Sequence, residues 1–302
     1  MGDFGFGAPG ATVTVGTFDG VHLAHRAVLD ETVRRATTAG QQSVLVTFEP
    51  HPLEVVRPAR APALLSTPLE RRAALAETGI GHVLVLAFDA AMAALPPGRF
   101  VREMLMARTQ MRALVIGYDH GLGRDRTGDV DALRAIGEAE GFSVTVVPPV
   151  EVNGVRVSSS VIRQAITEGD LGLAARLLGR PYRVSGPVVP GERRGRVLGV
   201  PTINLEVPPR KLLPPDGVYA VRVEWRDGVA GGMLNQGPKP TFGEGRRTLE
   251  AHLFGVARDL YGEWVRIEWV ARLRDVQRFG SPAELVEQLE RDRSAATAAL
   301  GL

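Results

Sequence analysis

The chain has 302 residues, 44% of them hydrophobic and 23% charged, with a formal net charge of +2 and no cysteine. This length favours two domains, and the composition is that of a globular protein. The lack of cysteine excludes disulfides and thiolate metal sites and agrees with a cytoplasmic location, while a charge near balance gives no support for nucleic-acid binding. No apolar run approaches a membrane span, and residues 1–10 lack the basic and apolar regions of a signal peptide.

The first half alternates short β-rich runs with helical patterns. Strands are predicted over Thr12–Val15, Ser43–Phe48, Val83–Phe88, Ala113–Gly117 and Ser143–Val147, and helices over His22–Ala39, Pro68–Thr78, Pro97–Ala107 and Val130–Glu140. This alternation predicts a parallel sheet, and continuous apolar strands such as VLVLAF (83–88) predict that helices cover both of its faces. Ligands of such sheets bind beyond the carboxyl ends of the strands, where the turn 16–20 lies.

The pattern changes near residue 181. Residues 158–182 predict two short helices, and the Gly- and Pro-rich stretch that follows predicts a small β-barrel. Its strands are expected at Tyr182–Val189, Gly217–Trp225, Ala230–Gln236, Thr248–Phe254 and Trp264–Leu273. A capped helix over 281–300 closes the chain, with Ser281 as N-cap, Pro282 at the first helical position and Glu284 completing a capping box. We therefore predict two domains, 1–180 and 181–302.

Two histidines stand at the start of the first predicted helix, in VTVGTFDGVHLAHRAVL (13–29). Gly16 and Gly20 let the backbone approach a ligand closely, and His22 and His25 share one helix face. A helix start adds unpaired N–H groups and the positive end of the dipole. The stretch therefore predicts a polyphosphate site. The alternatives are a surface histidine pair and a half-formed metal site.

A second phosphate-binding element is predicted in VSSSVIR (157–163). Ser158, Ser159 and Ser160 precede a helix that carries Arg163, so serine hydroxyls and a bidentate arginine could hold phosphate oxygens. The alternative is an ordinary helix cap with a solvated arginine.

The second half has no G-x-x-x-x-G-K-[ST] sequence, which excludes a P-loop kinase by motif. Its loop GPVVPGERRGRVLGVPTINL (186–205) is rich in glycine and arginine, and such loops cradle phosphates with backbone N–H groups. Thr202 and Asn204 would share one face of a strand and offer oxygen ligands to a hydrated Mg²⁺. In TLEAHLFG (248–255), Glu250 and His252 share a strand face, so a carboxylate facing into a barrel rim is a general-base candidate. The alternatives are a turn-rich rim and an ordinary surface strand.

The first half resembles the nucleotidylyltransferase half of the bacterial bifunctional riboflavin kinase/FAD synthetase family. GTFDGVHLAH (16–25) is similar to its G-x-F-D-G-x-H-x-G-H signature, and TFEPHP (47–52), VIGYDHGLGRDRTGD (115–129) and VSSSVIR follow in the family's order and spacing. The resemblance implies a Rossmann-like fold and AMP transfer from ATP to FMN. It implies ATP binding by Gly16, Phe18, Asp19, Gly20, His22, His25, Ser158, Ser159 and Arg163, with His22, His25 and Arg163 catalytic, and flavin binding by Asp119 and Asp129.

Five positions depart from this family pattern. Ala24 replaces a glycine, Gly121 and Leu122 replace an Arg-Phe pair, Ser160 replaces a threonine and Val161 a basic residue. The phosphate-handling residues are retained, so the departures concern FMN affinity and the rate of adenylyl transfer.

The second half is similar to the family's riboflavin kinase domain. GRVLGVPTINL, DGVYAV, NQGPKPTF, LEAHLF, DLYG and RLRDVQRFGSPAEL occur in the same order. The resemblance implies ATP binding by Gly195, Arg196, Thr202 and Asn204, Mg²⁺ ligation by Thr202 and Asn204, flavin binding by Asn235, Arg274 and Phe279, and Glu250 as catalytic base.

The resulting prediction is an enzyme that converts riboflavin to FMN and FMN to FAD, with ATP, riboflavin and FMN as small-molecule substrates. No nucleic-acid, membrane or obligate protein partner is expected. The alternatives are a riboflavin kinase with a weakened or inactive adenylyltransferase domain, and a flavin or nucleotide sensor without turnover.

Overall fold

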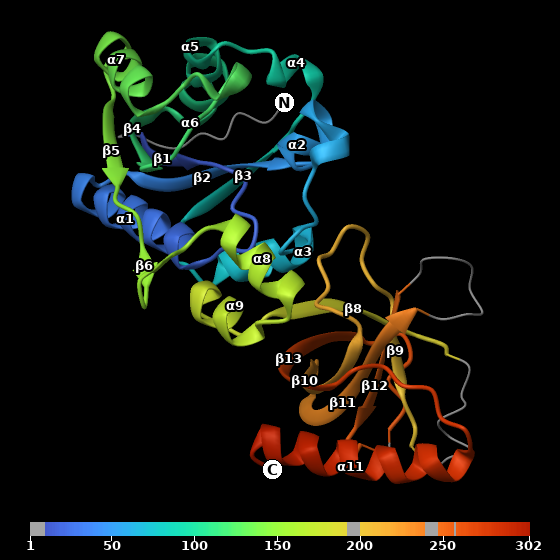
Figure 1. The fold of residues 1–302 in the computed structure, drawn as a ribbon. Coiled ribbons are helices and arrows are strands. Elements are labelled where there is room, and N and C mark those ends of the chain that lie inside the picture. The colour runs from blue at the N-terminus through green and yellow to red at the C-terminus, as the bar shows by residue number, and fades with distance from the viewer. Residues whose placement is uncertain (1–9, 192–199, 239–246, 257) are drawn as a thin grey trace. The chain divides into compact units, whose positions relative to one another are not determined.

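The computed structural model describes residues 10–191, 200–238, 247–256 and 258–302 (Figure 1). The chain divides into two compact units, one of Met1–Leu64 with Pro68–Ser159 and the other of Leu65–Thr67 with Ser160–Leu302. Residues 160–178, which hold nearly all of the two predicted short helices, therefore group with the second unit. The division into 1–180 and 181–302 concerns the two activities, and it stays a prediction.

The first unit contains the predicted βα alternation. Its elements are β1 (Ala11–Val15), α1 (Leu23–Ala39), β2 (Gln42–Glu49), α2 (Pro52–Val56), the 3-10 turn η1 (Pro58–Arg60), α3 (Pro68–Ala76), β3 (His82–Ala87), α4 (Ala90–Ala93), α5 (Pro97–Phe100), the π-helical turn η2 (Val101–Met106), α6 (Ala107–Thr109), β4 (Met111–Gly117), the 3-10 turn η3 (Arg124–Arg126), α7 (Val130–Glu140), β5 (Ser143–Val147), β6 (Glu151–Val152) and β7 (Val155–Arg156). The helix α8 (Ser159–Glu168) begins at its last residue.

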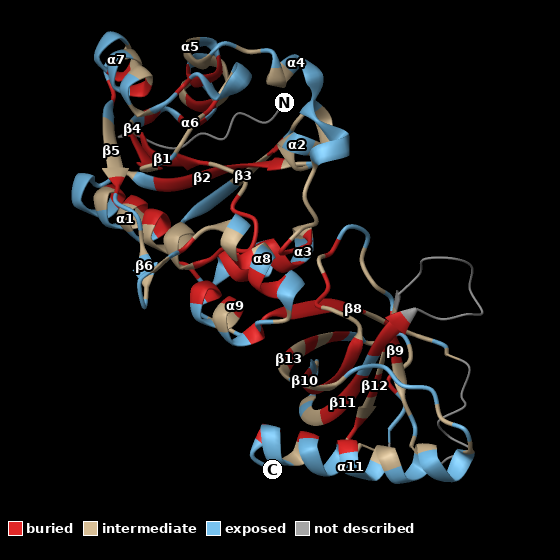
Figure 2. Cartoon of the chain, viewed as in Figure 1, coloured by how far each residue is buried: buried red, intermediate tan, exposed pale blue. Residues whose placement is uncertain are grey.

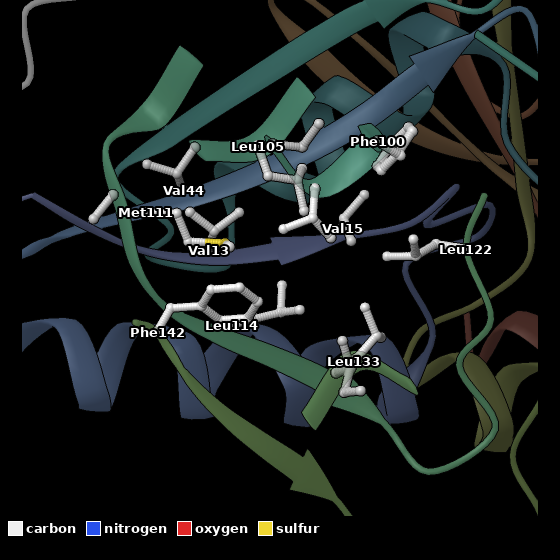
Figure 3. Close-up of a cluster of buried hydrophobic side chains, with 14 of the residues drawn as sticks. Val13, Val15, Val44, Phe100, Leu105, Met111, Leu114, Leu122, Leu133 and Phe142 are labelled. Atoms are coloured by element: carbon white, nitrogen blue, oxygen red, sulfur yellow. The ribbon is translucent and has the colours of Figure 1, made fainter. Parts of the chain in front are cut away.

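Five parallel strands form the sheet, in the order β3-β2-β1-β4-β5. Apolar side chains leave both faces, because successive residues of a strand point to opposite sides. Val44 and Val46 join a cluster with Phe100 and Leu105 from α5 and η2, and Figure 3 shows Val44, Phe100 and Leu105. Leu45 instead joins Leu29 of α1 and Leu75 of α3. The prediction of a parallel sheet covered on both faces is confirmed.

The strand β3 is an exception to that coverage. It lies at the edge of the sheet, and its Val83 side chain is 39% exposed although VLVLAF reads as a fully buried strand. An edge strand has only one neighbour, so apolar composition alone overestimates its burial.

The first unit differs from the predicted elements at four places. His22 is the N-cap of α1 rather than its first residue. The predicted helix over Pro97–Ala107 continues to Thr109 and contains the π-helical turn. Short elements such as α2 and α4 were not predicted, because a single turn carries no periodicity. The β6-β7 hairpin was also missed, although its Asn153-Gly154 turn, with φ of 52° and 77°, is a known hairpin signal.

The second unit is a closed six-stranded barrel, preceded in the chain by two helices and followed by one. After α8 come α9 (Leu171–Leu178), β8 (Arg183–Val189), β9 (Ile203–Leu205), β10 (Gly217–Trp225), β11 (Gly228–Pro238), β12 (Arg247–Leu253), β13 (Trp264–Arg274) and α11 (Pro282–Leu300). The barrel order is β10-β11-β12-β9-β8-β13, which confirms the predicted barrel and terminal helix. Trp269 and Tyr219 are among its largest buried side chains, and Figure 2 shows the buried strands beside a mostly exposed α11.

The barrel also differs from the prediction at two points. The strand β9 was considered only as the place where Thr202 and Asn204 would share a face and was given no bounds, because three residues are too few to show an alternating pattern. At α11, Ser281 Oγ accepts from Glu284 N as expected, but the Glu284 carboxylate accepts from Gly280 N rather than from the N-cap amide. The capping box is therefore incomplete.

Within the described residues, no helix combines the length and apolarity that crossing a membrane requires.

Candidate functional sites

The turn that follows β1 is built from residues in unusual backbone conformations. Phe18 and Val21 have φ of 49° and 40°, and Gly20 has φ of 86°. Positive φ is costly for side chains with a Cβ and most of all for β-branched ones, so strain of this kind marks functional sites. A Cβ on Gly16 would lie 3.1 Å from the Phe18 ring, which explains why glycine leads the turn.

The two histidines are brought together at the start of α1. Their rings stack at 3.6 Å with an interplanar angle of 12°, and the Phe18 ring lies 4.6 Å from that of His25. His22 caps the helix, since its Nδ1 accepts from the backbone N–H of His25 at 3.3 Å. In a neutral His22 the proton must then reside on Nε2, which leaves that nitrogen as a donor. Their sequence spacing does place the pair on one face.

The serine element reaches the same turn. Ser159 Oγ donates to the backbone carbonyl of Asp19 at 3.2 Å, a contact between residues 140 positions apart. Asp19 itself is buried, with 2% of its surface exposed. Ser158 precedes α8, whereas Arg163 lies further along that helix and belongs to the second unit. The roles of Ser158, Ser159 and Arg163 at ATP phosphates stay predictions.

The loop 118–129 carries the two acidic residues predicted to bind flavin. Asp129 caps α7, since its Oδ1 accepts from Ala132 N at 2.9 Å. Asp119 is exposed, and its backbone carbonyl accepts from Arg126 Nη2 at 3.0 Å. Sequence reasoning missed the cap, although an aspartate directly before a helical pattern is its usual signal. Flavin binding by both residues stays a prediction.

The same loop explains two departures from the family pattern. Leu122 and Gly128 pair through two backbone hydrogen bonds of 3.0 and 3.1 Å, and the Leu122 side chain is buried in the core cluster drawn in Figure 3. A Cβ on Gly121 would lie 3.1 Å from Arg126 Cβ, so Arg126 fills the space that a larger residue would need. Gly121 and Leu122 are thus matched to this loop.

A cluster of oxygen-bearing side chains lies on one face of the barrel wall. Register pairs Glu250 of β12 with Asn204 of β9 on one side and with Asn235 of β11 on the other. Thr202 Oγ1, just before β9, donates to Glu250 Oε1 at 2.8 Å. Cross-strand partners have Cβ atoms about 5 Å apart, so these four side chains share one site.

This cluster corrects the expected direction of Glu250. Leu249 and Ala251 are 0% exposed and fill the barrel interior. The intervening Glu250 therefore points to the outer face of the barrel wall and not into the barrel. His252, on the same face, has Nδ1 2.8 Å from the carbonyl oxygen of Pro201. Gly191 passes so close to the Asn204 amide that a Cβ there would clash with it. Gly195 and Arg196, the other predicted ATP-binding residues, lie outside the described residues.

The donor chemistry of this cluster suits Mg²⁺. A hydroxyl, an amide oxygen and a carboxylate are the hard oxygen ligands that the ion prefers. Among the described residues no group of three or more His, Asp or Glu side chains could hold a metal alone. Thr202 and Asn204 therefore fit an ion that completes its shell with water and substrate phosphates, and the Glu250 carboxylate lies beside them.

Arg274 forms an ion pair with Asp292, a residue that was not predicted from the sequence to belong to the site. Its Nε and Nη2 donate to the two carboxylate oxygens of Asp292 at 2.8 and 2.7 Å, and Asp292 is 3% exposed on α11. Its guanidinium carbon also lies 5.8 Å from the Phe279 ring centroid. Arg274 and Phe279 are thus adjacent, as a shared flavin site requires, and Asp292 orients the arginine.

The fold and the two sites define the class of protein. One unit is a parallel α/β fold with a strained turn at a helix start, and the other is a barrel with an oxygen-rich wall, as a two-domain enzyme that acts on phosphorylated substrates would have. Residues 7–161 match the family model for FAD synthetase, and residues 178–300 match that for riboflavin kinase.

Relatives over the full length agree. Bifunctional riboflavin kinase/FMN adenylyltransferases from Pseudomonas fluorescens and Escherichia coli (strain K12) are 40% and 38% identical over 96% and 97% of this chain, and 93% and 94% of those proteins are covered. A crystal structure described as a macrolide-efflux protein from Streptococcus pneumoniae is 32% identical, with a TM-score of 0.85 over 96% of this chain and 95% of that chain. The chain belongs to the bifunctional riboflavin kinase/FMN adenylyltransferase family. The predicted fold class and the pairing of a riboflavin kinase with an FMN adenylyltransferase are confirmed.

Proposed function

We propose that Glu250 is the base of the riboflavin kinase reaction. The attacking group is the terminal hydroxyl of the ribityl chain, and an alcohol must lose its proton as it attacks phosphorus. Glu250 is the carboxylate at the centre of the barrel-wall cluster, and the hydrogen bond from Thr202 Oγ1 to Glu250 Oε1 fixes one oxygen. The other oxygen is left to accept the proton of riboflavin. This single hydrogen bond is the observation that carries the assignment.

Thr202 and Asn204 supply the nucleotide side of the same site. Their hydroxyl and amide oxygen would hold Mg²⁺, which when bound neutralises charge on the ATP phosphates. Asn204 is 7% exposed and backed by Gly191, so its amide is held in place before substrate arrives. Gly195 and Arg196 belong to the proposed ATP site as well, and Asn235, Arg274 and Phe279 to the flavin side.

The first unit would transfer AMP from ATP to FMN and release pyrophosphate. The attacking FMN phosphate is already an anion, so this reaction requires positioning and charge neutralisation rather than a strong base. The His22 and His25 rings and the N–H groups at the start of α1 lie around one turn and provide such donors. The Ser159 hydroxyl donates to the Asp19 carbonyl of the same turn. Arg163 would add a bidentate contact to phosphate oxygens.

The proposal is tested by incubating the full chain with Mg-ATP and riboflavin and separating the flavins chromatographically. FMN should form first and FAD should follow. Accumulation of FMN without FAD, even when FMN is added at high concentration, would instead support a riboflavin kinase with an inactive first domain. Calorimetry that shows flavin or nucleotide binding without any product would support a sensor. Action in the cytoplasm, without nucleic acid, membrane or an obligate protein partner, stays a prediction.

A further inference from the structure

A buried arginine lies behind the strained turn of the first unit. Arg71 of α3 is 8% exposed, which is unusual for a charged side chain. Its Nη1 donates to the backbone carbonyl of Thr17 at 3.1 Å, and its Nη2 donates to that of Phe48 at 3.1 Å. The Glu49 carboxylate lies 3.9 Å from Nη2. One guanidinium therefore joins the turn after β1 to the end of β2.

The Thr17 carbonyl is the last anchored group before the strain begins. Gly16 N donates to Val46 O at 3.0 Å, which continues the sheet pairing, and Thr47 Oγ1 donates to the Thr17 carbonyl at 3.2 Å. The next residue, Phe18, has φ of 49°. A non-glycine residue in this region costs on the order of 1–3 kcal/mol and persists only where the surroundings over-determine it. The two hydrogen bonds to Thr17 are such determinants.

We propose that Arg71 is a positioning residue for adenylyl transfer. It holds the turn 16–22 against the end of β2 through the Thr17 and Phe48 carbonyls, and thereby fixes the orientation of His22 and His25. The inference rests on the proposed role of these histidines at ATP. Its distinctive feature is that the arginine acts from the far side of the turn, 54 residues away in sequence from Thr17.

Lysine should not replace this arginine. Only a planar guanidinium presents two parallel donors that can bridge two carbonyls at a fixed separation, whereas an ammonium is a point charge on a flexible stem. Arg72, the next residue of α3, offers a matched control. Its side chain is 58% exposed, and its Nη2 donates to Glu49 Oε2 at 3.3 Å.

The experiment compares Arg71→Lys with Arg72→Lys in the full chain, and measures FAD formation from added FMN and FMN formation from riboflavin. In Arg71→Lys the kcat for FAD formation should fall by about 10²-fold, the loss expected for a misplacement of about 1 Å. FMN formation should be unchanged, and Arg72→Lys should leave both rates at the wild-type value. Because the kinase site lies on the same chain, it serves as an internal control for protein concentration.

A purely stabilising role would give a different pattern. Thermal unfolding identifies the temperature range in which both variants are folded, and the loss in Arg71→Lys should persist throughout that range. An Arg71→Lys rate equal to that of Arg72→Lys, or a loss that vanishes on cooling, would overturn the inference. Failure of the proposed adenylyl transfer itself would give a different result from failure of the role of Arg71. In that case the wild-type protein would make no FAD, or a His25→Ala variant would make FAD normally.

Discussion

Replacing Asp292 by alanine should destabilise the barrel unit, because it removes one partner of a buried ion pair. Asp292 is 3% exposed, and the Arg274 side chain that it binds is 16% exposed. Removing one partner of a buried pair costs about 3–5 kcal/mol, mainly because the other charge is left unpaired. Arg274 keeps a hydrogen bond from Nη1 to the backbone carbonyl of Asp275 at 2.9 Å. We therefore expect the lower end, about 3 kcal/mol.

The assay is thermal unfolding of the full chain with riboflavin kinase activity followed in parallel. For a domain of this size, about 3 kcal/mol corresponds to a fall in Tm of roughly 10 °C. Asp275→Asn is the matched control, because Asp275 is 79% exposed where it pairs with Arg272, and an exposed pair contributes less than about 1 kcal/mol. If Asp292→Ala and Asp275→Asn unfold at the same temperature, the reasoning about the buried pair is wrong.

Two further predictions concern single residues. Burial, and to a smaller extent Arg126, lowers the pKa of His120 from 6.5 to about 4. As the pH falls, the His120 imidazole is therefore protonated in the unfolded chain before it is protonated in the folded one. His120 makes the folded state less stable as the pH falls from 6.5 to about 4. The unfolding free energy of the wild type should fall relative to that of His120→Asn over this range in denaturant titrations, and a constant difference would contradict the prediction. Gly191→Ala should displace the Asn204 amide and lower FMN formation while FAD formation from FMN is unchanged, and a wild-type rate of FMN formation would show that the position of Asn204 is not required.

Much of the architecture follows from patterns that the sequence displays. Five apolar runs separated by helical patterns predict the parallel sheet, and alternation in TLEAHL predicts which side chains of β12 share a face. Exposure of β3 could not be predicted, because the position of a strand within a sheet depends on pairings that its own residues do not determine. The three residues of β9 are likewise too few to identify alone.

The sites divide in the same way. His22 and His25 stand in one short motif whose spacing brings their rings together, as the stacking shows. Thr202 and Glu250 stand in two motifs, and only the fold joins them by a hydrogen bond. Arg71 and Asp292 were missed because neither stands in a motif and each acts through a contact with another segment. In the sequence, Arg71 lies in an ordinary helical pattern beside Arg72, and Asp292 reads as one more charged residue of α11. Only tertiary burial distinguishes these two residues from their neighbours.

We propose that one chain carries two independent catalytic sites, one around Glu250 and one around His22 and His25. The most direct test of this proposal measures both reactions in Glu250→Gln and His25→Ala, each as the full chain and each shown to be folded. We expect Glu250→Gln to lose FMN formation and keep FAD formation from added FMN, and His25→Ala to show the reverse. Loss of both reactions in both folded variants would contradict the proposal.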